Sequence, residues 1–139
     1  MTSPRVVLDT NVLISGLYFG GKPKKIIEHA LAGRIQLFTS TVLIDEFKTV
    51  VAIKFSGRAF ADNTLTELGL LWQIIPDKIL IRLAVIAADP ADDRVLECAV
   101  AAQADCIVSG DKHLLEIENF GKIAIMAPND FLRIVDDLR

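Results

Sequence analysis

The sequence has little positive charge, little cysteine and no long uninterrupted apolar run. Its 15 Lys and Arg residues are outnumbered by 18 Asp and Glu residues, which gives a formal net charge of -3. This balance excludes nucleic-acid binding by bulk electrostatics, so a polyanion would bind through a local basic patch or through metal ions. The longest apolar stretches are interrupted by charge, and the sequence opens without a signal-peptide pattern, so we expect no membrane association.

Cysteine is represented by two residues, Cys98 and Cys106, whose spacing is unlike that of metal sites. Both lie within apolar patterns, which predicts small buried hydrophobic side chains in a protein of the reducing cytoplasm. Internal repeats, charge blocks and linkers rich in Gly and Ser are also missing. Since 52% of the 139 residues are hydrophobic and 24% are charged, we predict a single folded domain over residues 1–139.

Short apolar runs alternate with helical patterns along the chain. Long helical patterns occupy residues 41–54 and 58–71. Because strands that alternate with helices usually form a parallel sheet covered on both faces, we predict an α/β fold. The predicted architecture is a three-layer α/β/α sandwich with a central parallel sheet of about five strands. The predicted strands are 6–8, 35–38, 72–75, 106–109 and 123–126, with a strand-like but irregular segment at 79–87.

Two carboxylates directly follow apolar strands. Asp9 ends the first predicted strand, and Asp111 comes just after the strand Cys106–Ser109. Because the carboxyl ends of parallel strands meet at one edge of a sheet, we expect both acids at that edge, in the crevice where α/β proteins bind ligands. Thr10 and Asn11 would face the same crevice. The alternative for Asp9 is a purely structural N-cap of the following helix.

A third carboxylate, Glu46, lies on the predicted helix 41–54 in line with apolar residues three or four positions away. One interpretation is a solvated edge residue whose aliphatic stem covers the core. The other is a carboxylate that points inward, toward the strand ends. The helix leaves the same edge of the sheet as Asp9, which favours the second interpretation.

Residues 89–93 form the most acidic point of the chain. Pro90 suits the first position of a helix, which makes Asp89 a plausible N-cap and explains Asp92 by its favourable interaction with the helix dipole. Asp93 is then left for a functional role. The spacing leaves the choice between Asp92 and Asp93 open, since each heads a stripe of the helix that would face the sheet. The stripes are Asp93, Leu96, Val100 and Gln103, and Asp92, Val95 and Ala99.

Four carboxylates at one sheet edge would repel one another unless their pKa values rise or cations neutralise them. A set of oxygen ligands without His or Cys suits Mg²⁺ or Mn²⁺ rather than zinc. Two such ions about 3.5 to 4 Å apart can activate a water and stabilise the leaving oxygen of a phosphodiester. This chemistry would reconcile an acidic chain with a nucleic-acid substrate.

Four motifs, in this order, resemble the PIN domain family, the nuclease fold of the VapC-type toxins of bacterial and archaeal toxin-antitoxin systems, and particularly its toxin branch. The resemblance covers almost the whole chain and implies a PIN-like fold. The motifs are Leu8-Asp9-Thr10-Asn11-Val12-Leu13, Leu43-Ile44-Asp45-Glu46-Phe47, Asp89-Pro90-Ala91-Asp92-Asp93, which precedes the fourth strand, and Ile107-Val108-Ser109-Gly110-Asp111-Lys112-His113-Leu114.

The resemblance also implies an activity, a cofactor and partners. The activity is that of a metal-dependent endoribonuclease that cleaves single-stranded or structured RNA. The implied partners are an antitoxin protein that covers the site and a second copy of the chain in a homodimer. The implied Mg²⁺ or Mn²⁺ ligands are Asp9, Glu46, Asp93 and Asp111, with Asn11 and Ser109 as supporting polar groups.

Several residues near these motifs have a weaker assignment. His113 stands where many family members have a further acid, so it is a candidate general acid, although a surface histidine is the commoner outcome. Asp92 remains the substitute for Asp93. A basic track for RNA would consist of Lys22, Lys24, Lys25 and Lys112, with Lys48, Lys54 and Arg58 nearby, against the default of scattered solvated side chains.

Other function classes also place an Asp after an apolar first strand. A haloacid-dehalogenase-like phosphatase needs a second Asp two residues later, where this sequence has Asn11. A response-regulator receiver needs a central acceptor Asp after the third strand, and only Pro76-Asp77 is available there. A catalytically silent PIN-like RNA-binding module is a third hypothesis, and the intact set of four acids argues against it.

Overall fold

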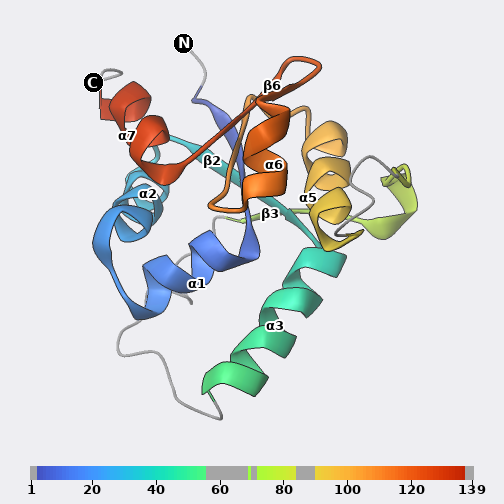
Figure 1. Cartoon of the computed structure of the whole chain (residues 1–139), viewed down its shortest axis with the longest axis horizontal. Coiled ribbons are helices and arrows are strands. Elements are labelled where there is room, and N and C mark those ends of the chain that lie inside the picture. Colours follow the sequence, from blue (N-terminus) through green and yellow to red (C-terminus); the bar gives the residue numbers. More distant parts are fainter. Residues whose placement is uncertain (1–2, 56–68, 70–71, 84–89, 137–139) are drawn as a thin grey trace.

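The computed structural model describes residues 3–55, 69, 72–83 and 90–136 (Figure 1). Within them, six strands form one sheet in the order β3-β2-β1-β4-β6-β5. Five strands are parallel, as predicted, and β5 adds an antiparallel edge to β6. The strands are β1 (Arg5–Leu8), β2 (Gln36–Ser40), β3 (Gln73–Ile75), β4 (Cys106–Val108), β5 (Asn119–Phe120) and β6 (Ile123–Met126).

Helices cover both faces of this sheet. Alternate residues of a strand point to opposite faces, and β1 separates the two cores in this way. Val6 and Leu8 pack with α1, α2 and α7, whereas Val7 packs with α5 and α6. The predicted three-layer α/β/α sandwich is therefore confirmed. The helices are α1 (Thr10–Tyr18), α2 (Gly21–Leu31), α3 (Thr41–Phe55), α5 (Pro90–Ala101), α6 (Lys112–Ile117) and α7 (Pro128–Asp136).

Helix α3 has a different position from the others. It leaves the C-terminal end of β2 and extends away from the sheet (Figure 1). Its first turns bridge the two layers, because Leu43 packs into one core and Phe47 into the other. The Ser40 hydroxyl accepts a hydrogen bond from the Leu43 amide at 3.3 Å and so caps the N-terminus of α3. Glu46 lies between these two apolar anchors.

Both cysteines lie in the interior, as the composition predicts. Cys98 is in the middle of α5, and Cys106 begins β4. Burial raises the pKa of each thiol to about 12. Thiols of such high pKa are poor nucleophiles and poor metal ligands at neutral pH, so the two residues act as packing groups.

Some predicted boundaries differ from the structure. The first helix begins at Thr10, directly after Asp9. The strand-like segment at 79–87 is not a strand over its described part, since a 3-10 turn (Asp77–Ile79) leads into irregular backbone up to Leu83. At Leu83 the backbone is bonded by side chains of α5 instead of by a neighbouring strand. Asp89, Arg58 and all of the predicted helix 58–71 except Gly69 lie outside the described residues.

The helices also bear on the expectation that the protein does not enter a membrane. In the described parts of the chain, no helix combines the length and the apolar character that a bilayer crossing requires.

Candidate functional site

The candidate site is built at the C-terminal edge of the sheet, where β1 and β4 end side by side. Leu8 is paired with Val108 in the parallel register, and the Asp9 amide continues the ladder by donating to the Val108 carbonyl at 3.0 Å. Beyond this backbone ladder, side chains connect the two segments. The buried Ser109 hydroxyl donates a hydrogen bond to Asp9 Oδ2 at 2.7 Å. Two segments a hundred residues apart are thereby joined through a carboxylate.

Ser109 also connects Asp9 to Asp111. Its hydroxyl oxygen accepts a hydrogen bond from the Asp111 amide at 3.0 Å, and its hydroxyl proton remains available for the hydrogen bond that it donates to Asp9. The Asp111 carboxylate is held in turn by the start of α6. Its Oδ1 accepts from the His113 amide at 2.8 Å and from the Leu114 amide at 3.4 Å. Asp111 is therefore the N-cap of α6 as well as a member of the acidic group.

Asp9 occupies the N-cap position of α1, but its carboxylate makes no capping hydrogen bond. The purely structural interpretation of Asp9 is therefore not supported. The residue is only 6% exposed, and no Lys, Arg or His among the described residues forms an ion pair with it. Burial raises the pKa of Asp9, the Ser109 hydrogen bond opposes this rise, and repulsion from Asp111 adds to it. A cation would relieve both unfavourable contributions.

The structure brings a third carboxylate to this edge through Thr10. The Thr10 side chain is buried at the first position of α1, and its hydroxyl donates to Glu46 Oε2 at 3.2 Å. Glu46 is half-buried on α3, and its Oε2 is directed at Thr10 at the C-terminal end of β1. Of the two interpretations of Glu46, the inward-pointing one describes the structure. Asn11, a predicted supporting residue, is instead exposed.

Asp92 and Asp93 are both buried in the first turn of α5, a helix that packs on β1, β2 and α3. The Asp93 stripe does not face the sheet over its whole length, because Val100 and Gln103 are exposed while Leu96 is buried. That part of the prediction is wrong. The stripe of Asp92, Val95 and Ala99 is buried throughout, so burial alone does not separate the two acids.

Oxygen atoms make up the donor set that Mg²⁺ or Mn²⁺ would meet here. The Ser109 hydroxyl joins Asp9 to Asp111, and Thr10, the residue after Asp9, bonds Glu46, with no His or Cys side chain in these contacts. The chemistry of these donors fits a hard divalent cation. In the described part of the chain, however, no three His, Cys, Asp or Glu side chains already lie close enough to hold one ion. Small side-chain movements would have to accompany binding.

The remaining predicted residues lie around this network. His113 is half-buried and touches Asp111 through its backbone amide, without a hydrogen bond from its ring to a described residue. Lys22, Lys24 and Lys25 are on the first half of α2, and Lys112 is the exposed first residue of α6. The Lys22 ammonium donates to Asn129 Oδ1 at the start of α7, at 2.5 Å.

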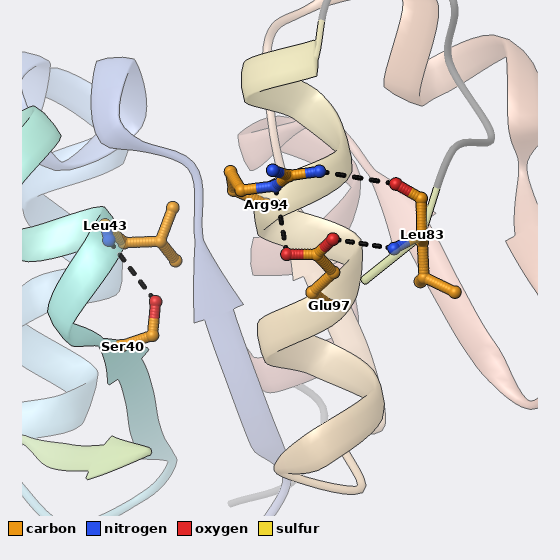
Figure 2. Close-up of polar contacts among 5 residues, drawn as sticks. All are labelled: Ser40, Leu43, Leu83, Arg94 and Glu97. Carbon is orange, nitrogen blue, oxygen red and sulfur yellow. Dashed lines mark hydrogen bonds and ion pairs between the residues drawn. The ribbon is translucent and has the colours of Figure 1, made fainter. Parts of the chain in front are cut away.

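Glu97 is a buried carboxylate that the sequence analysis did not identify. It lies on α5, one turn after Asp93, and is 2% exposed. Figure 2 shows its carboxylate directed at the Leu83 amide, 2.7 Å away, and at Arg94, with which it forms an ion pair at 2.9 Å. The Arg94 and Glu97 spacing of three residues on one helix was the available signal for this pair. Its role is structural, since its carboxylate is already bonded to two groups of the fold, the Leu83 amide and the Arg94 side chain.

Known proteins resemble the chain in sequence and in fold. The family model described as PIN domain matches residues 5–113. A solved structure of VapBC2 from Rickettsia felis, bound to a DNA fragment from its promoter, superposes with a TM-score of 0.53 at 14% identity, over 87% of this chain and 96% of that one. PAE2754 from Pyrobaculum aerophilum superposes with a TM-score of 0.58 at 15% identity, over 96% of this chain and 90% of that one. No curated protein gives a significant match.

The two structural likenesses are likenesses of fold, because sequence identity is low in both. The family match is stronger evidence. It runs from the first residue of β1 into α6 and includes Asp9, Glu46, Asp93 and Asp111. The four predicted acids and the elements from β1 to β4 thus lie inside the matched region, and the chain belongs to the PIN domain family.

Proposed function

We propose that the protein is a Mg²⁺- or Mn²⁺-dependent endoribonuclease that hydrolyses RNA phosphodiesters and is the toxin component of a toxin-antitoxin pair. The observation that carries this proposal is the buried Asp9 carboxylate, which is joined to Asp111 through Ser109 and has no cationic side chain as an ion-pair partner among the described residues. Membership of the PIN domain family supports the nuclease class.

In this proposal Asp9, Glu46, Asp93 and Asp111 hold the cation. A bound Mg²⁺ or Mn²⁺ would activate a water for in-line attack on the phosphodiester and stabilise the leaving oxygen. Ser109 keeps Asp9 in place by donating its only proton to Oδ2. The α6 amides hold Asp111 by one oxygen, Oδ1, while no described residue hydrogen-bonds the other.

The proposed substrate and partners are those expected for a metal-dependent ribonuclease of this family. The cation would neutralise the phosphate next to the carboxylates, so the chain does not need a strongly basic surface there. Exposed Lys25 and Lys112, with Lys22 and Lys24, would contact the RNA backbone farther away. The likeness to VapBC2, which was crystallised on promoter DNA, supports an antitoxin that covers the site. We also propose a homodimer, as the family resemblance implies.

The decisive experiment incubates the purified protein with a panel of single-stranded and structured RNAs in Mn²⁺, in Mg²⁺ and in EDTA. Cleavage is expected with either ion and not with EDTA. Asp9→Asn is expected to reduce the cleavage rate by at least about 10²-fold, since it removes a ligand charge at the reacting centre. Cleavage that persists in Asp9→Asn at the wild-type rate would overturn the proposal.

A matched pair of variants on α3 provides the control. Glu46→Gln and Asp45→Asn each remove one negative charge from neighbouring positions, but Asp45 is exposed whereas Glu46 bonds Thr10. Loss of cleavage is expected for Glu46→Gln alone. RNA that binds but stays intact in every ion would instead indicate a silent PIN-like RNA-binding module, and acid-labile phosphate on Asp9 would indicate a phosphotransfer enzyme.

A further inference from the structure

We propose that Thr10 is a positioning residue, whose hydroxyl holds the Glu46 carboxylate at the metal site. The inference rests on the proposed function, because it assigns Glu46 to the cation. Thr10 is separate from the four acids and from Asn11, the neighbour to which the family resemblance gives a supporting role. The exposed Asn11 makes no hydrogen bond through its side chain to a described residue, whereas Thr10 is buried and bonded.

The position of Thr10 suits this role. It directly follows Asp9, so its backbone is fixed by the last hydrogen bond of the β1–β4 ladder and by the first turn of α1. It is 4% exposed, and its hydroxyl donates to Glu46 Oε2 at 3.2 Å. Helices α1 and α3 contact each other, which keeps the two side chains opposite one another. A β-branched side chain such as Thr has few rotamers in a helix, so its hydroxyl is a rigid donor.

Glu46 needs such a donor more than the other acids do. Its carboxylate is at the end of three rotatable bonds on α3, a helix that extends away from the sheet (Figure 1). Asp9, by contrast, has a short side chain directly after β1. A long side chain left free loses more conformational freedom when an ion binds. A hydroxyl that donates to the carboxylate restricts this side chain before the ion binds. Groups that hydrogen-bond a metal ligand in this way commonly change metal affinity by about 10- to 100-fold.

The same arrangement occurs at Asp9, which supports a common purpose. There the buried Ser109 hydroxyl, from the neighbouring strand, donates to Asp9 Oδ2. Each of the two carboxylates is thus held by a buried hydroxyl from an element that approaches it from elsewhere in the chain. In both cases the hydroxyl gives its proton to one oxygen of the carboxylate and so restrains the side chain.

The test compares Thr10→Val, which keeps the shape and removes the hydroxyl, with Thr10→Ser, which keeps the hydroxyl. Thr41→Val is the matched control, because Thr41 is the exposed first residue of α3. Calorimetric titration of each metal-free protein with Mn²⁺ is expected to show at least about tenfold weaker binding for Thr10→Val. Thr10→Ser should stay within about threefold of wild type, and Thr41→Val should equal it.

Cleavage kinetics give a second readout that a purely structural role would not move. In Thr10→Val, kcat at low Mn²⁺ should fall while KM for the RNA is unchanged, and excess Mn²⁺ should restore kcat. Equal Mn²⁺ affinity in Thr10→Val and wild type would overturn the inference. Equal defects in Thr10→Ser and Thr10→Val would also overturn it, since the hydroxyl would then be irrelevant.

A double-mutant cycle separates this inference from the proposed function. Unfolding midpoints of wild type, Thr10→Val, Glu46→Gln and the double variant are measured in EDTA, so neither metal nor RNA is involved. The shift caused by Glu46→Gln is expected to be smaller in the Thr10→Val background. Strict additivity would overturn the Thr10 assignment even if the enzyme cuts RNA. A wild-type protein that neither binds Mn²⁺ nor cuts RNA would overturn the proposed function, and with it the metal role of this contact, whatever the cycle shows.

Discussion

At the scale of single residues, Asp9 and Asp111 have nearly the same surroundings in sequence but different partners in the structure. Each follows a buried strand and precedes a helix. Asp111 caps its helix, so two amides of α6 stabilise its charge. Asp9 makes no capping hydrogen bond to α1, and its charge is stabilised by the Ser109 hydroxyl and by the backbone of Thr10 and Asn11. Asp9 also differs in that burial, together with repulsion from Asp111, raises its pKa, so its charge is costly in the absence of a cation.

This difference predicts a pH-dependent effect of Asp9→Asn on the metal-free protein. Because folding raises the pKa of Asp9 above its ordinary value of 3.8, the stabilising contribution of the protonated acid is complete below about pH 3.8 and is lost as the pH rises through the folded-state pKa. At pH 7 the charged form therefore destabilises the fold, and Asp9→Asn should be more stable than wild type.

Urea unfolding in EDTA at a series of pH values between 4 and 7 measures this effect. The advantage of Asp9→Asn should be largest at pH 7 and should shrink as the pH falls. Asp45→Asn, at an exposed position, is the control and should show little change at any pH. An advantage that does not depend on pH would show that the charge of Asp9 is not its cause.

For Asp111, two substitutions separate the cap from the charge. Asp111→Asn keeps an oxygen for the His113 and Leu114 amides, so it should be nearly as stable as wild type. Asp111→Ala removes the cap and should lower the free energy of unfolding by about 1 kcal/mol. Both should lose Mn²⁺ affinity, measured by calorimetry. Wild-type Mn²⁺ affinity in Asp111→Asn would remove this residue from the proposed metal site.

At the scale of elements, α5 is held to the irregular segment before it by a buried charged cluster. Glu97 bonds the Leu83 amide and pairs with Arg94, and Arg94 also donates to the Leu83 carbonyl at 3.3 Å (Figure 2). Both polar groups of the Leu83 backbone are thus satisfied without a strand. The cluster fixes the first two turns of α5, which carry Asp92 and Asp93.

Breaking this cluster should therefore be costly. Arg94→Ala leaves the buried Glu97 carboxylate without its cation and should lower the free energy of unfolding by about 3 kcal/mol. The matched control is Arg133→Ala on α7, which removes an arginine with the same spacing from Asp130 but an exposed pair at 3.8 Å. That variant should change stability by less than about 1 kcal/mol. Similar losses for the two variants in urea unfolding would contradict the structural role of Glu97.

At the scale of the whole molecule, the parallel sheet concentrates negative charge at one edge. Five parallel strands end there, and α1, α3, α5 and α6 begin there, so acids at strand ends and helix starts meet. The opposite edge is different. Cavities of about 690 and 430 Å³ lie there around Asp105, and none of the four predicted carboxylates lines them. Repulsion among the acids at this edge would oppose folding, and a cation at the proposed site would relieve it.

Metal binding should consequently stabilise the fold. The thermal midpoint of wild type should rise with Mn²⁺ in a saturable way, since an ion that binds only the folded state adds about 2.7 kcal/mol at a concentration of a hundred times its Kd. EDTA should reverse the rise. Asp9→Asn should show little response, although its metal-free form is the more stable one. A midpoint that is indifferent to Mn²⁺ in scanning fluorimetry would contradict a folded-state metal site.

Periodicity predicted the elements whose burial follows a simple local rule. The strands ending at Leu8 and Met126 and helix α3 agree with the sequence patterns, because short apolar runs mark the strands and apolar residues three or four positions apart mark the helix. The patterns failed where burial depends on distant partners. Val100 continues an apolar stripe of α5 but is exposed, and the largely apolar segment 79–83 forms no strand, with the Leu83 backbone bonded by α5 side chains.

For the candidate site, the sequence is enough to predict which acids lie at the same sheet edge. Alternating strands and helices bring acids at strand ends to one edge of a parallel sheet, independently of the contacts between side chains. The contacts among those residues do not follow from the sequence. Whether Asp9 caps its helix or bonds Ser109, and whether Thr10 or Asn11 meets Glu46, depends on the distance between side chains that are 36 to 100 positions apart. Such distances arise only when the packed helices and the sheet register bring those segments together.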